Sequence, residues 1–166
     1  GDVYKRQVLK TSPELVSEII EEAMQHIRPK AKTHSVTVVC EDDFLLVEAD
    51  AKLIVQVIIN LVDNALKYTP AGASISINAE RKESVAEISI TDNGNGISDA
   101  EKEKIFDKFY CGEHKIADNR RSLGLGLYLC KTIVEAHGGT ICVTDKQPHG
   151  AVFTFTLPLE EVTYHE

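Results

Sequence analysis

Two pairs of alternating segments restrict the fold of this chain more than any other feature of its sequence. SISINAE (74–80) and VAEISITD (85–92) alternate apolar and polar residues, and TICVTD (140–145) and AVFTFTLPL (151–159) form a second pair near the end of the chain. A period of two predicts strands that bury one side and leave the other in water. We therefore expect two hairpins in a mostly antiparallel sheet, with helices over its apolar face.

Three other segments are predicted to supply these helices. The first begins at Ser12-Pro13-Glu14, which reads as an N-cap, a proline at the first helical position and an acid in the first turn, and it stops near Pro29. The second is a long helix over 51–68, which Asp50 can cap. The third follows the glycines of LGLGL and ends at Gly138-Gly139, because glycines are typical of helix C-termini.

Residues 35–39 and 44–49 are predicted to form two further strands with an acidic turn between them. The expected order is helix, two strands, helix, two strands, a charged loop, helix and two strands. Such an order predicts an α+β fold with a mixed, mostly antiparallel sheet and its helices on one face.

Length and charge narrow the domain organisation and the function classes. With 166 residues and 43% apolar content, the chain is long enough for one domain with a core and too short for two of typical size. We place that domain at 12–159, with a leader at 1–11 that need not be native to it and a tail at 160–166. The net charge of -8 argues against binding nucleic acid through bulk charge. An anionic ligand would therefore need backbone N–H groups, a placed lysine or a metal ion.

Membrane and disulfide chemistry are not expected. No run reaches the roughly 18 apolar residues that span a bilayer, and no signal peptide is apparent. The four cysteines are Cys40, Cys111, Cys130 and Cys142. They show no C-x-x-C pair and no histidine at ligand spacing, so a zinc site or a disulfide framework is disfavoured, and we expect free thiols in a reducing cytoplasm.

The helix predicted over 51–68 carries a narrow polar stripe on an otherwise apolar surface. At about 100° per residue its apolar side chains cover a wide arc. The remaining stripe consists of Gln56, Asn60, Asp63, Asn64 and Lys67. The stripe can be the solvated face of a buried helix. Asparagine, however, is a poor residue for an exposed helix interior, and amide oxygens can bind Mg²⁺ while a lysine meets a phosphate, so both interpretations stay open.

Two glycine-rich turns are further candidates for a ligand site. Asp92 ends a predicted strand, where its carboxylate can accept a hydrogen bond from the exocyclic amine of a base, and Gly94 and Gly96 leave room for a flat ring. An ordinary Asp-Asn-Gly turn explains the same residues. Gly124 and Gly126 precede the third helix, whose N-terminal N–H groups can hold an anion. They come too late in the chain for a dinucleotide-binding fingerprint.

The order and spacing of four segments are more specific than any one of them. NLVDNALKYTP, DNGNGI, FDKFY and LGLGL resemble the N, G1, F and G2 boxes of the ATP-binding catalytic domain of bacterial sensor histidine kinases. That domain shares its superfamily with type II topoisomerases, MutL and the heat-shock chaperone ATPases. The resemblance covers 12–159, and details such as VEAHGG are most similar to the potassium-sensing KdpD kinases. It implies a two-layer α/β sandwich that binds ATP and Mg²⁺.

The resemblance also implies a role for each motif residue. In the N box, Asn64 would ligate Mg²⁺ with Asn60 beside it, Lys67 would lie near the phosphates, and Tyr68 would border the nucleotide. In the G1 box, Asp92 would bind the adenine amino group. The other implied residues shape the base pocket (Gly94, Gly96 and Ile97), anchor the lid (Phe106 and Phe109) or wrap the phosphates (Gly124, Leu125 and Gly126).

The chain departs from the family pattern in three places. Cys111 stands where an arginine usually contacts the phosphate end of ATP, and we expect Arg120 or Arg121 to replace it. Ser122-Leu123 opens the G2 box, where glycine and a small polar residue are frequent. No His-Glu phosphoacceptor box is present, so the acceptor must lie outside this chain. His137 is predicted to be structural, and the other histidines are assigned to the first helix, the lid, or surface positions and turns (His26, His114, His34, His149 and His165).

Three functions follow from these residues. The preferred one is the kinase half of a two-component sensor, which transfers the γ-phosphate of Mg·ATP to a histidine on a separate dimerisation domain and so serves a response regulator. We expect it in the cytoplasm, with no nucleic-acid partner and with membrane contact only through other parts of the parent protein. The second is an ATP hydrolase of the topoisomerase or chaperone type, whose general base is commonly a glutamate where this chain has Asn60, leaving Asp63 as the candidate base. The third is a nucleotide-binding regulatory module whose catalysis is degraded at Cys111.

Overall fold

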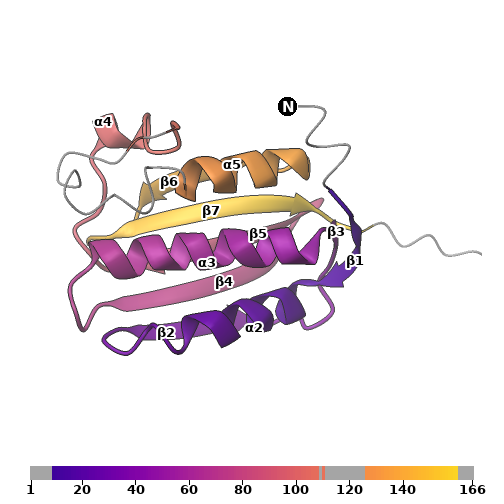
Figure 1. Ribbon diagram of the computed structural model, residues 1–166, viewed down its shortest axis with the longest axis horizontal. Coiled ribbons are helices and arrows are strands. Elements are labelled where there is room, and N and C mark those ends of the chain that lie inside the picture. Colours follow the sequence, from indigo (N-terminus) through magenta and orange to yellow (C-terminus); the bar gives the residue numbers. More distant parts are fainter. Residues whose placement is uncertain (1–8, 109, 111–125, 161–166) are drawn as a thin grey trace, which may run out of the picture.

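The computed structural model describes residues 9–108, 110 and 126–160 (Figure 1). Its elements follow the expected order of helices and strands from α2 onward. In chain order they are β1 (Ser12–Leu15), α2 (Val16–Ile27), β2 (Ser35–Cys40), β3 (Leu46–Ala49), α3 (Ala51–Tyr68), β4 (Ser74–Lys82), β5 (Val85–Asp92), α4 (Asp99–Lys102), α5 (Gly126–Ala136), β6 (Ile141–Asp145) and β7 (Ala151–Pro158).

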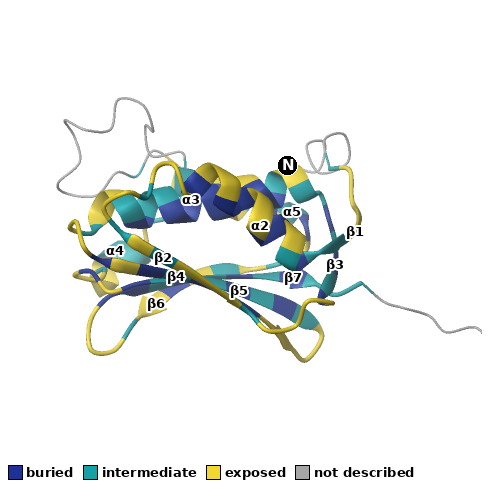
Figure 2. Ribbon diagram, turned by 90° about the horizontal axis from the view of Figure 1, so that it is seen from below, coloured by how far each residue is buried: buried dark blue, intermediate teal, exposed yellow. Residues whose placement is uncertain are grey.

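The strands form one large sheet and one small one. The large sheet has the order β2-β4-β5-β7-β6, in which β2 runs parallel to β4 and every other neighbouring pair is antiparallel. The small sheet pairs β1 with β3. Helices α2, α3 and α5 lie on one face of the large sheet, with α3 between the other two (Figures 1 and 2). The predicted α+β fold, with a mixed sheet and helices on one face, is confirmed.

The core lies between the helices and the inward side of the sheet, as the alternation predicted. Every second residue is buried in β5, in β7 and in β4 up to Ala79, and the largest of these are Ile75, Ile77, Ile88, Ile90, Phe153 and Phe155. Burying a side chain of this size stabilises the fold by about 1.5–3 kcal/mol. The outward side is polar: the hydroxyls of Ser89 and Thr154, on neighbouring strands, are 3.0 Å apart. Figure 2 shows the same division into a buried and a more exposed side.

The prediction that Ser12-Pro13-Glu14 begins a helix is wrong. These residues form β1, which pairs with β3 in the antiparallel register Ser12↔Ala49. The Ser12 hydroxyl donates to the Glu14 carboxylate instead of capping a helix. Helix α2 begins at Val16, and Leu15 at its N-cap provides no side-chain hydrogen bond. Pairing with a distant strand therefore overrides a local pattern that is typical of helix starts.

The two strands predicted over 35–49 exist, but they belong to different sheets. β2 joins the large sheet beside β4, whereas β3 joins β1. β3 buries Val47 and Ala49 in the core, so its position is set by that burial and by β1. Phe44, between the two strands, is 84% exposed and takes no part in the core.

The N-terminal end of α3 is fixed by His137, which follows α5. The backbone N–H of Asp50 donates to His137 Nε2 at 3.0 Å, and His137 Nδ1 lies 2.8 Å from the carbonyl of Ile133. Because a carbonyl only accepts, Nδ1 carries the proton. Asp50 occupies the predicted N-cap position, but its carboxylate accepts from the Lys10 N–H and does not cap the helix. His137 thus links α5 to α3, which agrees with its predicted structural role.

Candidate nucleotide site

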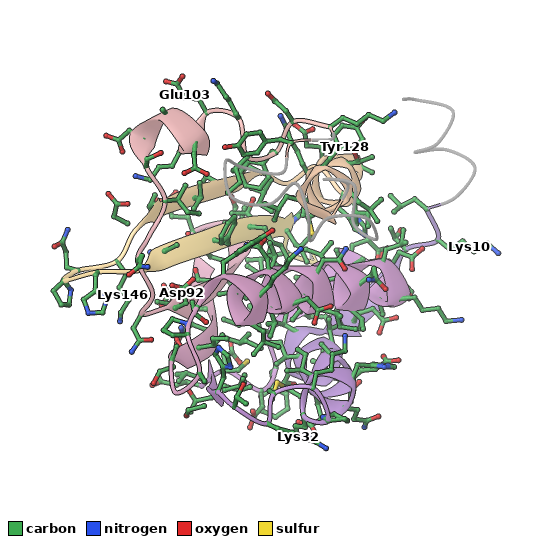
Figure 3. All side chains as sticks on the ribbon, turned by 60° about the vertical axis from the view of Figure 1, so that its left-hand side comes forward. Lys10, Lys32, Asp92, Glu103, Tyr128 and Lys146 are labelled. Atoms are coloured by element: carbon green, nitrogen blue, oxygen red, sulfur yellow. The ribbon has the colours of Figure 1, made fainter. Side chains whose placement is uncertain are left out.

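The described residues of the four motifs gather at one end of the molecule. The second half of α3, the turn that follows β5 and the start of α5 all lie there (Figure 1). Figure 3 shows Asp92 beside the C-terminal end of α3, with Lys146 on the same side. Several predicted site residues fall outside the described part of the chain. These are Phe109, Arg120, Arg121, Gly124 and Leu125, together with the departures at Cys111 and Ser122-Leu123.

Asp92 is a carboxylate at a position where the strand pattern calls for an apolar side chain. It ends β5, in which Ile88, Ile90 and Asp92 all point to the buried side, and it is only 8% exposed. Its Oδ1 accepts from the N–H of Gly94 at 2.9 Å and from that of Ala151 at 3.3 Å. Within the described residues Oδ2 accepts no hydrogen bond. The two backbone donors fix the orientation of the carboxylate, and Oδ2 is left to accept from a ligand.

The backbone around Asp92 is packed so closely that side chains are excluded at two positions. A Cβ on Gly94 would lie 2.7 Å from Cγ2 of Thr69 and 3.2 Å from Asp92 Oδ1. A Cβ on Gly150 would lie 2.0 Å from the backbone oxygen of Asp92, and Gly150 has a φ of +125° that favours glycine. Gly96, with a φ of +79°, faces the Gly150 carbonyl. These contacts explain why the turn needs its glycines.

Thr69 and His34 form one wall of this turn, and the sequence motifs did not single them out. The Thr69 hydroxyl donates to the Ala65 carbonyl at 2.7 Å, so it accepts from His34 Nε2 at 2.8 Å. The other ring nitrogen of His34 lies 2.9 Å from the Thr33 hydroxyl. His34 lies in a bend of the chain, in agreement with its predicted turn position, and its side chain also holds the threonine that packs against Gly94.

The turn between β6 and β7 forms the opposite wall, and it was also missed. His149 Nδ1 lies 3.0 Å from the carbonyl oxygen of Gly94. The next two residues, Gly150 and Ala151, contact Asp92 through the close approach and the N–H bond given above. The only sequence signal for this wall was a glycine ahead of an alternating strand. That signal predicts a tight turn without revealing which other turn it meets.

The polar stripe of α3 divides between two surroundings. Asp63 points toward the turn that follows α2, where its carboxylate forms an ion pair with Lys30 at 3.1 Å. The Asn60 amide oxygen accepts from Gln56, and Asn60 also contacts the thiol of Cys130 on α5. The three middle residues of the stripe are half-buried, whereas Gln56 and Lys67 at its ends are exposed, so the stripe is not a uniformly solvated face.

The C-terminal turn of α3 carries the remaining stripe residues, Asn64 and Lys67, next to Tyr68. Asn64 is half-buried, whereas Lys67 and Tyr68 are exposed. The Lys67 ammonium lies 5.4 Å from the centre of the Tyr68 ring, a cation–π distance. This last turn of α3 therefore combines an amide, a cation and an aromatic ring. It lies close to the Asp92 turn, because Thr69 directly after the helix packs against Gly94.

The segment after the Asp92 turn is tied to the sheet by two kinds of contact. Phe106 packs edge-to-face on Phe153, with ring centroids 6.0 Å apart, and Ile97 packs against the core. Lys102 lies 2.7 Å from both Asp99 and Asp145, and hydrogen bonds to Asp145 and then to Asp99 raise its pKa. The predicted anchoring role of Phe106 is consistent with this packing.

The described residues fit an adenine nucleotide better than a metal ion bound by protein side chains alone. A buried carboxylate with one open oxygen, beside backbone that excludes side chains, suits an exocyclic amine on a flat ring. Within the described ranges no three His, Cys, Asp or Glu side chains group as a metal site. Mg²⁺ often keeps few protein ligands and is held largely by phosphate oxygens, which is compatible with a single ligand such as Asn64.

The chain is similar to known proteins over most of its length. Residues 49–161 match the family described as histidine kinase-, DNA gyrase B-, and HSP90-like ATPase. The sensor protein KdpD of Clostridium acetobutylicum is 44% identical over 152 residues, covering 92% of this chain and 17% of the relative. This chain therefore spans less than a fifth of that relative. None of the helices in the described ranges is both long and apolar enough to cross a membrane.

Two solved structures of the histidine kinase ThkA share the fold. Its catalytic domain in a nucleotide-free form superposes with a TM-score of 0.79 at 30% identity, covering 90% of this chain and 95% of that one. A complex of ThkA with the response regulator protein TrrA gives a TM-score of 0.77 at 28% identity, covering 95% of this chain and 45% of the ThkA chain.

Proposed function

The chain belongs to the family of histidine kinase-, DNA gyrase B- and HSP90-like ATPases, and on that premise we propose that it binds Mg·ATP and donates the γ-phosphate to a histidine on a separate dimerisation domain. The observation that carries the proposal is the buried Asp92 carboxylate, which is fixed by two backbone N–H groups and whose Oδ2 accepts no hydrogen bond from the described residues. Relatives named sensor kinases support this reading over other members of the family.

Asp92 would select the base. Its Oδ2 would accept a hydrogen bond from the adenine amino group, and Gly94 and Gly96 would lie against the ring, with Ile97 at its edge. A guanine presents a carbonyl oxygen at the equivalent position, which would meet the carboxylate as a second acceptor. The burial of Asp92 strengthens both the attraction and the repulsion, because both act away from water.

The C-terminal half of α3 would hold the phosphate end. Asn64 would ligate Mg²⁺ with Asn60 beside it, and Lys67 would meet a phosphate oxygen while Tyr68 borders the nucleotide. Gly126 begins α5, whose N-terminal N–H groups would face the phosphates. Bound Mg²⁺ would neutralise charge on the transferred phosphoryl group, and positioning by these residues would supply the rest of the catalysis. Phe109, Arg120, Arg121, Gly124 and Leu125 remain predicted contributors.

The ion pair of Asp63 argues against the ATP hydrolase alternative. A hydrolase of this family needs a general base near the attacking water, and Asp63 was the candidate because Asn60 is an amide. Its carboxylate instead pairs with Lys30, in the turn that follows α2. We therefore propose phosphotransfer without efficient hydrolysis.

The acceptor histidine and the response regulator would be supplied by other polypeptide segments or proteins. His137 has both ring nitrogens engaged in the fold, so it is not available as an acceptor. The ThkA–TrrA complex supports a response regulator as the downstream partner. We assign the reaction to the cytoplasm, where ATP is available.

The transfer reaction tests the proposal directly. The chain is mixed with Mg·ATP, alone and together with a purified histidine-bearing dimerisation domain of a KdpD-type kinase. We expect phosphohistidine on the added domain and little free phosphate in either mixture. Rapid release of free phosphate by the chain alone would favour the hydrolase, and nucleotide binding without transfer would favour the regulatory module.

Substitution of Asp92 tests the base contact. Asp92→Asn keeps an oxygen for the Gly94 and Ala151 N–H groups but removes the charge and adds an amide donor toward the adenine amino group. We expect Asp92→Asn to weaken Mg·ADP binding about tenfold to 150-fold, because hydrogen bonds to charged groups contribute about 1.5–3 kcal/mol. Calorimetry gives the affinity, and urea unfolding of the same variant checks the fold. Wild-type affinity in Asp92→Asn would refute the assignment.

A further inference from the structure

We propose that His149 is a positioning residue of the nucleotide site: it holds the Gly94 carbonyl so that the turn carrying Asp92 keeps the shape that receives adenine. The inference rests on the proposed function. His149 belongs to none of the four motifs, and it lies in the turn between β6 and β7. Its role would be to act through Gly94 and Asp92 without itself touching the phosphates.

The contact between the two turns has three parts, all on the described residues. His149 Nδ1 bonds the Gly94 carbonyl at 3.0 Å, the Ala151 N–H bonds Asp92 Oδ1 at 3.3 Å, and Gly150 brings its backbone against the Asp92 carbonyl. The last two contacts hold Asp92 itself. The His149 bond holds the far side of the same turn, two residues later, next to Asn93, whose side-chain oxygen accepts from the Ser74 N–H at 2.8 Å.

The direction of the bond follows from its chemistry. A carbonyl oxygen only accepts, so His149 Nδ1 must carry the proton. Nδ1 also carries a proton in the imidazolium form, and the bond to Gly94 therefore survives protonation of the ring. His149 therefore donates to this carbonyl in either form of the ring.

His149 differs from the structural histidine at the other end of α3. His137 is only 8% exposed, and both of its nitrogens bond the backbone. His149 is exposed, and within the described residues only its Nδ1 is bonded. A donor on an exposed side chain contributes little to the stability of the whole fold. Its contribution is local, and the turn that it holds is the one that carries Asp92.

The experiment compares three variants with the wild-type chain by calorimetry with Mg·ADP. His149→Ala removes the donor. His149→Asn keeps one, because the asparagine amide nitrogen occupies nearly the position of Nδ1. His26→Ala is the matched control, because His26 is an exposed histidine on α2 that bonds neither turn. Urea unfolding of each variant measures the stability of the fold.

We expect His149→Ala to weaken Mg·ADP binding about threefold to tenfold, the value of one neutral hydrogen bond, and His149→Asn and His26→Ala to stay within about twofold of wild type. The unfolding midpoint should be unchanged in all three.

Several outcomes would overturn the inference. Wild-type affinity in His149→Ala would show that the bond does not support the site. Affinity as weak in His149→Asn as in His149→Ala would show that the donor is irrelevant. A loss equally large in His26→Ala would make the effect nonspecific. If the wild-type chain takes up no Mg·ADP, the proposed function itself fails, a result distinct from normal wild-type binding with an inert His149.

Discussion

At the N-terminal end of α3, Asp50 and His137 are joined by a hydrogen bond, and His137 uses both of its nitrogens within the fold. At the C-terminal end, Thr69 packs against Gly94, in the turn that contains a second aspartate, Asp92. A second histidine, His149, bonds the same turn. Within the described residues, Asp92 Oδ2 has no hydrogen-bond partner. Both ends therefore contain an aspartate and a histidine, but the two ends differ in how many of these polar atoms are hydrogen-bonded within the fold.

The difference separates polar groups that stabilise the fold from polar groups that are available to a ligand. A buried polar group whose bonds are all satisfied within the chain has nothing left for a ligand. A buried carboxylate with an unused oxygen beside three glycines is destabilising unless water or a ligand completes it. Substitutions at the N-terminal end should therefore change stability alone, whereas substitutions at the C-terminal end should change nucleotide affinity.

The glycines beside each end provide the largest expected effect. A Cβ on Gly139, near His137, would lie 1.8 Å from the Thr156 carbonyl oxygen, and one on Gly150 would lie 2.0 Å from that of Asp92. Gly139→Ala and Gly150→Ala should each lower the free energy of unfolding by about 3 kcal/mol, because backbone must move. In urea unfolding and calorimetry, only Gly150→Ala should also weaken Mg·ADP binding by the folded protein.

Gly72→Ala is the control for this pair. Gly72 has a φ of +91° but nothing within 4 Å of an added Cβ. Gly72→Ala should therefore lower the free energy of unfolding only by the conformational cost of about 1 kcal/mol. Loss of nucleotide affinity in folded Gly139→Ala would break the separation between the two ends.

Replacement of His137 should give the next largest effect. His137→Ala leaves the Asp50 N–H without its acceptor, and we expect the free energy of unfolding to fall by about 2 kcal/mol. His137→Gln places an amide oxygen near Nε2 and should recover part of the loss. Urea unfolding measures both, with His26→Ala as the exposed control. If His137→Ala were as stable as wild type, the closed network at this end would have no energetic role.

Between the two ends, Cys130 gives a smaller, pH-dependent effect. Burial raises the pKa of its thiol to about 12, against 9.0 in the absence of the fold, with contact from Asn60 acting in the opposite direction. Above pH 9 the unfolded chain loses this proton while the folded chain retains it, so stability falls as pH rises toward 12. From pH 9 to pH 10 the loss should be about 1 kcal/mol.

Cys130→Ala isolates this contribution from the other groups that titrate in the same range. The difference between wild type and Cys130→Ala in the free energy of unfolding should shrink steadily above pH 9, because only the wild-type chain has a buried thiol that loses its proton on unfolding. Urea unfolding across the alkaline range measures it. A constant difference would mean that the thiol is hydrated in the folded state.

The elements that were predicted correctly are those defined by neighbouring residues. The bounds of α3 and the two hairpins β4–β5 and β6–β7 follow from periods of 3.6 and 2 that are visible in short windows. The family is confirmed by the match over 49–161. The strand at Ser12–Leu15 and the separation of β2 from β3 could not be predicted in this way, because both depend on partners far along the chain.

The candidate site divides along the same line. Asp92, Gly94 and the stripe on α3 stand out because each motif is contiguous in the sequence. Thr69 and His149 acquire their roles only through packing, since their contacts join segments that are separated by many residues. The orientation of the Asp63 side chain could not be predicted from the sequence either, because it depends on the position of Lys30 in the fold.

The contact between Gly94 and His149 has a consequence for how the carboxylate is held in place. The two residues are 55 positions apart, yet the chain returns at His149 to the point that it left at Gly94. Helix α5 and strand β6 lie between them, one packed into the core and the other paired with β7. The turn that carries Asp92 is therefore completed only when the last hairpin of the chain has formed, because that hairpin supplies His149, Gly150 and Ala151.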